Sequence, residues 1–158
     1  MSLPDALVDL PAGWRVVPLD LLGAGAQGLE LVAAYETPDA GFTANITVGV
    51  QEPVQPAVVG VLGDAVVQHL RDAETGAVLR RREVLGAEPV PGLVQDVAFS
   101  TTVEGAEVAM LQTEAFVVSP HPDDAERVLV RTVTCTATAA QAGALADDVV
   151  AVIDALRP

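Results

Sequence analysis

Apolar and polar positions alternate along the first fifty residues, which predicts β-strands before any helix. Residues 42–50 (FTANITVGV) alternate at the period of a half-buried strand, and shorter apolar runs precede them at residues 14–19 and 29–36. Between the second and third runs, Pro38 and Gly41 are placed for a tight reversal. We therefore expect three strands that are antiparallel neighbours.

The spacing of apolar residues changes to that of a helix over residues 57–74, and Gly76 is a suitable stop. Short turns rich in Pro, Gly and Asp then separate four extended runs. Such reversals favour an antiparallel meander, because parallel strands need long crossovers. The four runs cover residues 77–85, 93–102, 107–118 and 127–137. A last helical stripe, residues 139–156, suits packing against a sheet.

The predicted order is βββ-α-ββββ-α, an α+β fold in which an antiparallel β-sheet of about six or seven strands is covered by helices in an α/β/α sandwich. Residues 107–118 are apolar on both parities, so we expect cover on both faces of the sheet. The 158 residues, 51% of them hydrophobic, contain no repeat or long linker. Residues 1–158 are therefore expected to form a single domain.

Composition bears on the compartment. Cys135 is the only cysteine, so no intrachain disulfide forms, which fits a reducing environment. The first residues lack the basic and apolar segments of a secretory signal, and no apolar run approaches the roughly 20 residues that cross a bilayer. We expect a cytoplasmic protein.

The formal net charge is −14, from 22 acidic residues against eight arginines and no lysine. Phosphate backbones and anionic lipids are repelled by such a surface, so neither nucleic acid nor a membrane is an expected partner. Two roles for the acidic charge stay open, namely solubility and recognition of a basic partner.

The glycines of residues 23–28 (GAGAQG) match the G-x-G-x-x-G pattern of dinucleotide-binding loops, and Glu52 follows near the place of a ribose-binding acid. However, Pro18 and Asp20 interrupt the preceding run, and β-compatible residues follow Gly28 where a helix is needed. No further βαβ unit is present. We therefore expect a flexible loop between strands, and no bound cofactor.

Arg80, Arg81 and Arg82 form the basic cluster of this acidic sequence. On a strand, Arg80 and Arg82 share one face and Arg81 takes the other. Arg80 and Arg82 are thus candidates for docking a carboxylate-rich partner or an anionic ligand. The alternative is that these charges keep an edge strand from aggregating and pair with nearby acids.

The other reactive side chains predict neither a catalytic nor a metal site. A turn with two prolines holds several close metal-ligand types, but close spacing alone does not make a coordination shell. These residues are His121, Asp123, Asp124 and Glu126. His69 suits a polar helix face, and Cys135 suits a small buried side chain in an apolar, threonine-rich strand.

Three segments carry a resemblance: LPAGW (residues 10–14) before the first strand, ANITV (residues 44–48) before a helix, and VTCTA (residues 133–137) before the last helix. Together with the element order over residues 10–156, they resemble the PsbP-like superfamily, and within it the LpqN and DcrB families of bacterial proteins. The resemblance implies an α/β/α sandwich used in binding, assembly or chaperoning. Many such relatives are exported lipoproteins. Export signal and lipobox cysteine are both missing here, which favours intracellular members that handle another protein.

We therefore interpret the chain as a noncatalytic protein-interaction module, an adaptor or chaperone for another bacterial protein. One alternative is a helix-grip-like carrier of a small apolar ligand, which is disfavoured because three strands precede the first helix. The other is a nicotinamide-cofactor enzyme that uses residues 23–28.

Overall fold

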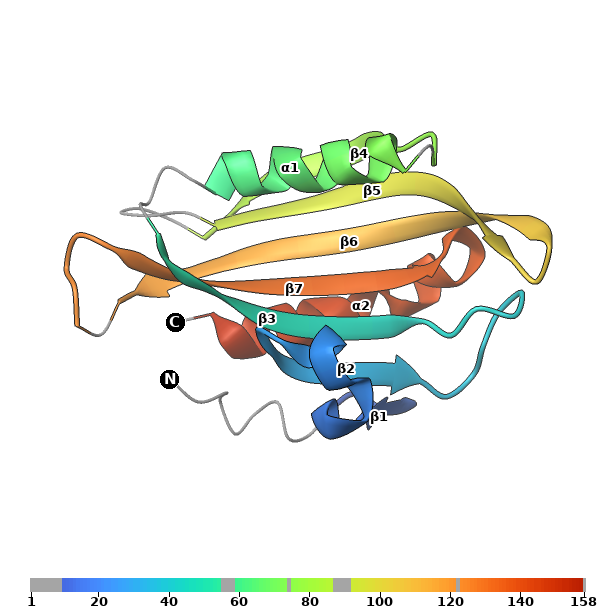
Figure 1. Cartoon of the computed structure of the whole chain (residues 1–158), viewed down its shortest axis with the longest axis horizontal. Coiled ribbons are helices and arrows are strands. Elements are labelled where there is room, and N and C mark those ends of the chain that lie inside the picture. Colours follow the sequence, from blue (N-terminus) through green and yellow to red (C-terminus); the bar gives the residue numbers. More distant parts are fainter. Residues whose placement is uncertain (1–9, 55–58, 74, 87–91, 122, 158) are drawn as a thin grey trace.

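A seven-stranded antiparallel sheet organises the computed structural model, which describes residues 10–54, 59–73, 75–86, 92–121 and 123–157. The strands are β1 (Trp14–Val16), β2 (Leu29–Tyr35), β3 (Asn45–Val54), β4 (Val78–Leu85), β5 (Gly92–Val103), β6 (Ala106–Pro120) and β7 (Val128–Thr138). The helices are the 3-10 segment η2 (Leu19–Ala26), α1 (Val59–Asp72) and α2 (Ala139–Leu156). The predicted α+β fold is confirmed (Figure 1).

Two meanders make up the sheet, whose strand order is β1-β2-β3-β7-β6-β5-β4. Strands β1 to β3 are antiparallel neighbours, as are β4 to β7, and the meanders join where β3 pairs with β7. The chain leaves the middle of the sheet after β3, passes through α1 and returns at the edge strand β4. The antiparallel pairing predicted for the first three strands is therefore confirmed.

The strand predicted for residues 42–50 begins later than expected. Asp39 and Phe42 exchange backbone hydrogen bonds of 3.0 and 2.9 Å, which closes a two-residue turn. Its central residues, Ala40 and Gly41, have φ of 51° and 78°, as a type I′ hairpin turn requires. Phe42 therefore belongs to the turn, and β3 begins at Asn45.

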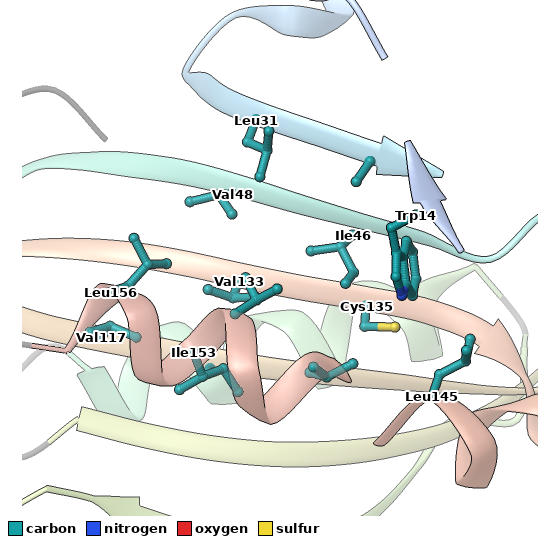
Figure 2. Packing of buried hydrophobic residues seen from close by; sticks show 14 of the residues in the cluster. Trp14, Leu31, Ile46, Val48, Val117, Val133, Cys135, Leu145, Ile153 and Leu156 are labelled. Carbon is teal, nitrogen blue, oxygen red and sulfur yellow. The ribbon is translucent and has the colours of Figure 1, made fainter. Parts of the chain in front are cut away.

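The α2 face is the side of the sheet that α2 covers, and its apolar side chains form the largest core cluster with those of α2 (Figure 2). Ile46 and Val133 are fully buried on adjacent strands, and Ile153 of α2 packs in the same cluster. The Thr138 hydroxyl caps α2 by accepting a hydrogen bond from the backbone N–H of Gln141. Each such buried aliphatic side chain stabilises the fold by about 1.5–3 kcal/mol.

The α1 face is the opposite side of the sheet. Val59, Leu62 and Val66 of α1 pack there against Leu93 of β5 and Phe116 of β6. Because Phe116 faces α1 while its neighbours Ala115 and Val117 face α2, both faces of the sheet are used, as predicted. None of the described helices is long and apolar enough to cross a membrane.

Candidate functional site

The two helices cover their faces unequally. Helix α2 lies along β6 and β7 in the centre of the sheet, whereas α1 lies over β4 and β5 near one edge (Figure 1). On the α1 face, η2 packs against β2 toward the other edge. Helix α1 also packs on Phe116 of β6. Beyond that contact, no described helix lies over β7 and β3 between α1 and η2 (Figure 1).

Polar side chains occupy this uncovered region, which we name the open strip. The pairing registers align Glu114 of β6 with Thr134 of β7, and Thr134 with Thr47 of β3. Gln112 and Thr136 form the next cross-strand pair along the same face. The open strip consists of Thr47, Gln112, Glu114, Thr132, Thr134 and Thr136. Hydroxyls and amides there can hydrogen-bond a partner that lies across the strands.

A hollow of about 470 Å³ opens where the open strip meets α1. We call it the α1 groove. Helix α1 contributes apolar side chains and His69 to it, and the sheet contributes polar side chains and Phe116. Its lining residues are Leu62, Ala65, Val66, His69, Leu70, Gln112, Glu114, Phe116 and Thr132. The volume falls within the roughly 300–1,000 Å³ of most small-molecule sites.

Glu114 is the unusual member of the α1 groove, because the residue is only 2% exposed. Burial raises the pKa of its carboxyl, and a hydrogen bond from the Gln112 amide, 2.5 Å long, opposes that rise. The nearby Thr132 hydroxyl oxygen is buried and has no described hydrogen-bond partner. Buried polar groups with unused hydrogen-bonding capacity are rare and indicate a candidate functional site.

A polar network positions α1 beside this groove. The Gln95 side chain, fully buried on β5, donates to the Gly63 carbonyl of α1 at 3.0 Å and accepts two hydrogen bonds from Arg82. Arg82 also pairs with Asp64 of α1 at 2.7 Å. A Cβ atom at Gly63 would approach Gln95 and Leu93 to 2.9 Å, so this glycine lets helix and sheet approach closely.

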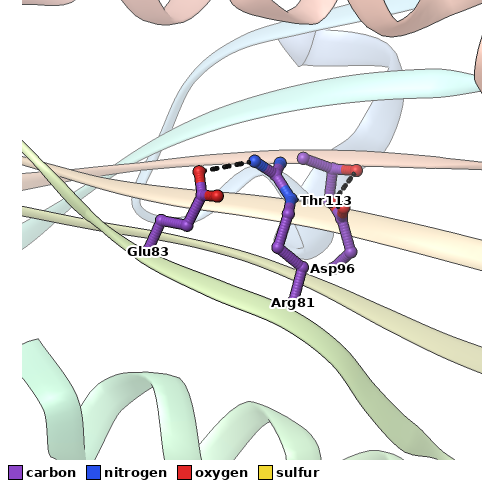
Figure 3. Close-up of polar contacts among 4 residues, drawn as sticks. All are labelled: Arg81, Glu83, Asp96 and Thr113. Atoms are coloured by element: carbon purple, nitrogen blue, oxygen red, sulfur yellow. Dashed lines mark hydrogen bonds and ion pairs between the residues drawn. The ribbon is translucent and has the colours of Figure 1, made fainter.

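The arginine cluster lies on β4, an edge strand, and two of its members pair with acids, as the alternative interpretation predicted. Arg81 binds Asp96 at 2.8 Å and Glu83 at 2.9 Å (Figure 3). Arg82 turns to α1. Asp96 also accepts a hydrogen bond from Thr113. Arg81 and Arg82 are therefore already occupied within the protein.

Arg80 stands apart from its two neighbours. Leu79 pairs with Val97 and Arg81 with Asp96, so a β-bulge inserts Arg80 between them and the simple alternation of faces is interrupted. Arg80 is exposed and makes no hydrogen bond or ion pair with another described residue. Docking of a partner at Arg80 and Arg82 stays a prediction.

A second cavity, of about 260 Å³, lies under α2 on the opposite face. Small residues such as Gly143 and Ala146 line its helix side, and the Arg81–Asp96 pair lies at its border. Cys135 also lines it, and burial raises the pKa of the thiol to about 12. This thiol therefore stays protonated and unreactive at neutral pH.

The glycine segment does not adopt the geometry of a dinucleotide-binding loop. Residues 19–26 form η2, with a kink at Gly23, so the flexible loop predicted there is wrong in detail. Gly28 leads directly into β2, which pairs antiparallel with β1 and β3. A pyrophosphate site needs a helix N-terminus after the glycines, and here a strand follows.

The remaining predicted candidates lie apart from the α1 groove, except His69 at its rim. The His121 ring nitrogen accepts a hydrogen bond from the Asp123 backbone within its own turn, and Asp124 pairs with Arg127. Among the described residues, no three His, Cys, Asp or Glu side chains are grouped to hold a metal ion.

No protein-family model matches the chain, and no curated protein matches its sequence. Solved structures do resemble it. LpqN of Mycobacterium tuberculosis, involved in cell envelope biogenesis, aligns with a TM-score of 0.63 at 15% identity, over 92% of this chain and 78% of LpqN.

Two further structures align over similar lengths. The PsbP protein (CyanoP) of Synechocystis sp. PCC 6803 gives a TM-score of 0.51 at 14% identity, covering 92% of this chain and 81% of that one. The Ran-binding protein Mog1p of Saccharomyces cerevisiae gives 0.52 at 13% identity, covering 93% and 82%. The chain therefore has the PsbP-like fold, as the sequence resemblance predicted.

Proposed function

We propose that this chain is a noncatalytic module that binds a basic amphipathic helix of another protein on the open strip. The observation that carries the proposal is the uncovered polar centre of the α1 face, where Glu114 and Thr132 have unused hydrogen-bonding capacity beside α1. An adaptor or chaperone acts through a surface of this kind. One solved structure with the same fold, Mog1p, is a Ran-binding protein, which supports a protein partner here.

The spacing of the elements favours a helix as the occupant. Strands β5 and β2, which lie under α1 and η2, are separated by four strand spacings, or about 19 Å. Packed helices lie about 8–10 Å apart, so one further helix fits between α1 and η2. Such a helix would add a second layer to the α1 face.

Charge favours a basic partner. The chain carries a net charge of −14, and the open strip contains one buried carboxylate, that of Glu114. Opposite charge on the partner would speed the encounter and offset the penalty of covering Glu114. The second role considered for the acidic surface, recognition of a basic partner, is therefore part of the proposal.

The carrier and the enzyme are less well supported. The cavity under α2, about 260 Å³, falls below the roughly 300–1,000 Å³ of most small-molecule sites, and its bordering charges already pair with each other. For a nicotinamide enzyme, the glycine segment would need a helix after Gly28, and β2 takes that place.

Titration calorimetry of the full chain with two synthetic 18-residue peptides tests the proposal. Both carry leucine on one helical face, and the other face carries lysine in one peptide and glutamate in the other. We expect the lysine peptide to bind at least tenfold more tightly, with amide NMR shifts centred on the open strip. Equal binding of the two peptides, or shifts centred elsewhere, would overturn the proposal.

Matched arginine substitutions separate this site from general attraction to an acidic surface. Thr134→Arg places a cation in the open strip, whereas Thr102→Arg makes the same charge change at an exposed site near the β5–β6 hairpin. Only Thr134→Arg should abolish binding. Sedimentation of the free chain covers another occupant: a dimer that Thr134→Arg dissociates would mean that a second copy occupies the strip, and the proposal would be wrong.

A further inference from the structure

The α1 groove has the form of a pocket for one long side chain. Its floor carries Glu114 and Phe116 from β6 and Thr132 from β7, and its wall is formed by Leu62 and Val66 of α1. Acceptor oxygens therefore lie at the base, and apolar surface lies along the side. A side chain with a methylene stem and a polar head matches this distribution.

Hydrogen-bonding capacity at the base is incomplete. Gln112 is the one described side chain that donates to Glu114, and it does so to Oε1. An ionised carboxylate accepts about four hydrogen bonds, so Glu114 retains acceptor sites. The Thr132 hydroxyl oxygen, on the neighbouring strand, has no described partner although it is buried. Glu114 of β6 and Thr132 of β7 can therefore each accept a further hydrogen bond.

No cation of the described chain lines the groove. Arg82 of β4 pairs across the strands with Gln95 of β5, which in turn pairs with Glu114 of β6. Arg82 is therefore one strand removed from Glu114, and it is already bound to Gln95 and Asp64. A buried carboxylate is normally paired with a cation or with several donors. Glu114 has neither within the described residues, so a bound partner could supply the cation that pairs with it.

We propose that the α1 groove receives a lysine side chain of the bound helix, with its ammonium on Glu114 and Thr132. This inference rests on the proposed function and names its recognition residue. The three donors of an ammonium reach both oxygens, and the methylene stem lies against Leu62 and Val66. Arginine fits less well, because its planar fork pairs with both oxygens of a carboxylate, and the Gln112 amide already takes one of the two acceptor positions of Oε1.

A small probe tests the pocket without a peptide. Titrated n-butylammonium chloride should shift the side-chain carboxyl carbon of Glu114 and the amide of Thr132 saturably, and n-propylguanidinium should bind several-fold more weakly. Glu114→Gln should weaken n-butylammonium at least tenfold. Glu107→Gln removes the same charge from an exposed site on the same strand and should leave the affinity unchanged. Thr132→Val keeps the shape of the side chain and should weaken binding of n-butylammonium several-fold. It provides an independent test of the pocket if Glu114→Gln fails to fold.

Peptides then distinguish this inference from the proposed function. A lysine peptide should bind several-fold more tightly than its arginine counterpart, and Glu114→Gln should abolish that preference. Equal binding of both peptides on the open strip, unaffected by Glu114→Gln, would overturn the lysine pocket and leave the proposed function standing. If n-butylammonium binds but neither peptide does, the ligand is a free amine, and both proposals are wrong.

Discussion

The two faces of the sheet differ in what covers them and in how far their side chains are satisfied. On the α2 face, an 18-residue helix lies over the central strands and buries residues such as Ile46 and Val133 in one apolar cluster. On the α1 face, the 14-residue helix lies toward one edge and leaves threonines and Glu114 in the centre. Side chains of α2 fill the α2 face, whereas the α1 face has room and unused hydrogen-bonding groups for another molecule.

Neighbouring residues on one strand show how this difference arises. Along β6, Glu114 and Phe116 face α1, while Ala115 and Val117 face α2. Because side chains alternate along a strand, one sequence segment builds both surfaces. Stability and the proposed binding can therefore be tested separately by substitutions only one residue apart.

The largest expected effect comes from truncating the α2 face. Ile46→Ala removes a fully buried side chain and should lower the free energy of unfolding by about 2–5 kcal/mol. Thr47→Ala, at the next residue, changes a half-buried position of the open strip and should lower it by less than about 1 kcal/mol. Urea unfolding of both variants measures the contrast. Similar losses would mean that the open strip is also a packed core.

Helix α1 should show the next largest effect, through two of its glycines. Gly63→Ala gains helix propensity but pushes a Cβ to 2.9 Å from Gln95 and Leu93, and such overpacking typically costs about 1–3 kcal/mol. Gly60→Ala has open space and should stabilise the fold by up to about 1 kcal/mol. Thermal melts should therefore shift in opposite directions. If Gly63→Ala stabilises as much as Gly60→Ala, then α1 does not approach the sheet as closely as described.

Most of the fold could be predicted because local periodicity carries it. The alternation of β3 and the helical stripe of α2 depend on which residues must be buried, and both are readable from the sequence. The start of β3 was misplaced, since Ala40 takes a positive φ that alanine rarely adopts and the turn therefore reaches Phe42. The η2 segment was also missed, because glycine and alanine carry little positional information.

The candidate site could not be predicted, because it depends on where α1 lies across the sheet. That position is held by Gly63 and Gln95, which are 32 residues apart and show no local pattern together. One weak signal was present. Gln112 and Glu114 share one parity of β6 with the apolar residues Met110 and Phe116. Two polar residues within an otherwise apolar face indicate that this part of the face is not simply a packed core.

The pH dependence of stability sharpens the comparison at Glu114. Burial raises the folded-state pKa of Glu114 above its ordinary value of 4.5. Below that value both states hold the proton; as pH rises, the unfolded chain ionises first, so the free energy of unfolding falls until folded Glu114 also ionises. Glu114→Gln lacks this loss, so its stability relative to the unaltered chain should increase as the pH rises above 4.5, as measured by urea unfolding.

Other charges near Glu114 bear on this experiment. His69 of α1 lines the groove. Arg82 of β4 is bound to Gln95 and pairs with Asp64. Because these contacts do not involve Glu114, we expect His69, Arg82 and Asp64 to stay in place in the Glu114→Gln variant. Glu107→Gln serves as the control at an exposed position. A difference between Glu114→Gln and the unaltered chain that does not change with pH would mean that Glu114 is well solvated. Added lysine peptide should reduce the difference, because a cation favours the ionised carboxylate.

The smallest effect is expected at the hairpin before β3, which belongs to neither face. Ala40 has φ of 51°, and asparagine tolerates that conformation better than alanine, so Ala40→Asn should raise the free energy of unfolding by about 0.5–1 kcal/mol. Gly41→Ala should do the reverse, because φ is 78° and the added Cβ would approach the Glu104 carboxylate to 3.0 Å. Neither change should alter binding of the lysine peptide by more than about twofold, a free-energy change of about 0.4 kcal/mol. A larger change in calorimetry would extend the binding surface to the hairpin and end the simple division between a filled face and an open one.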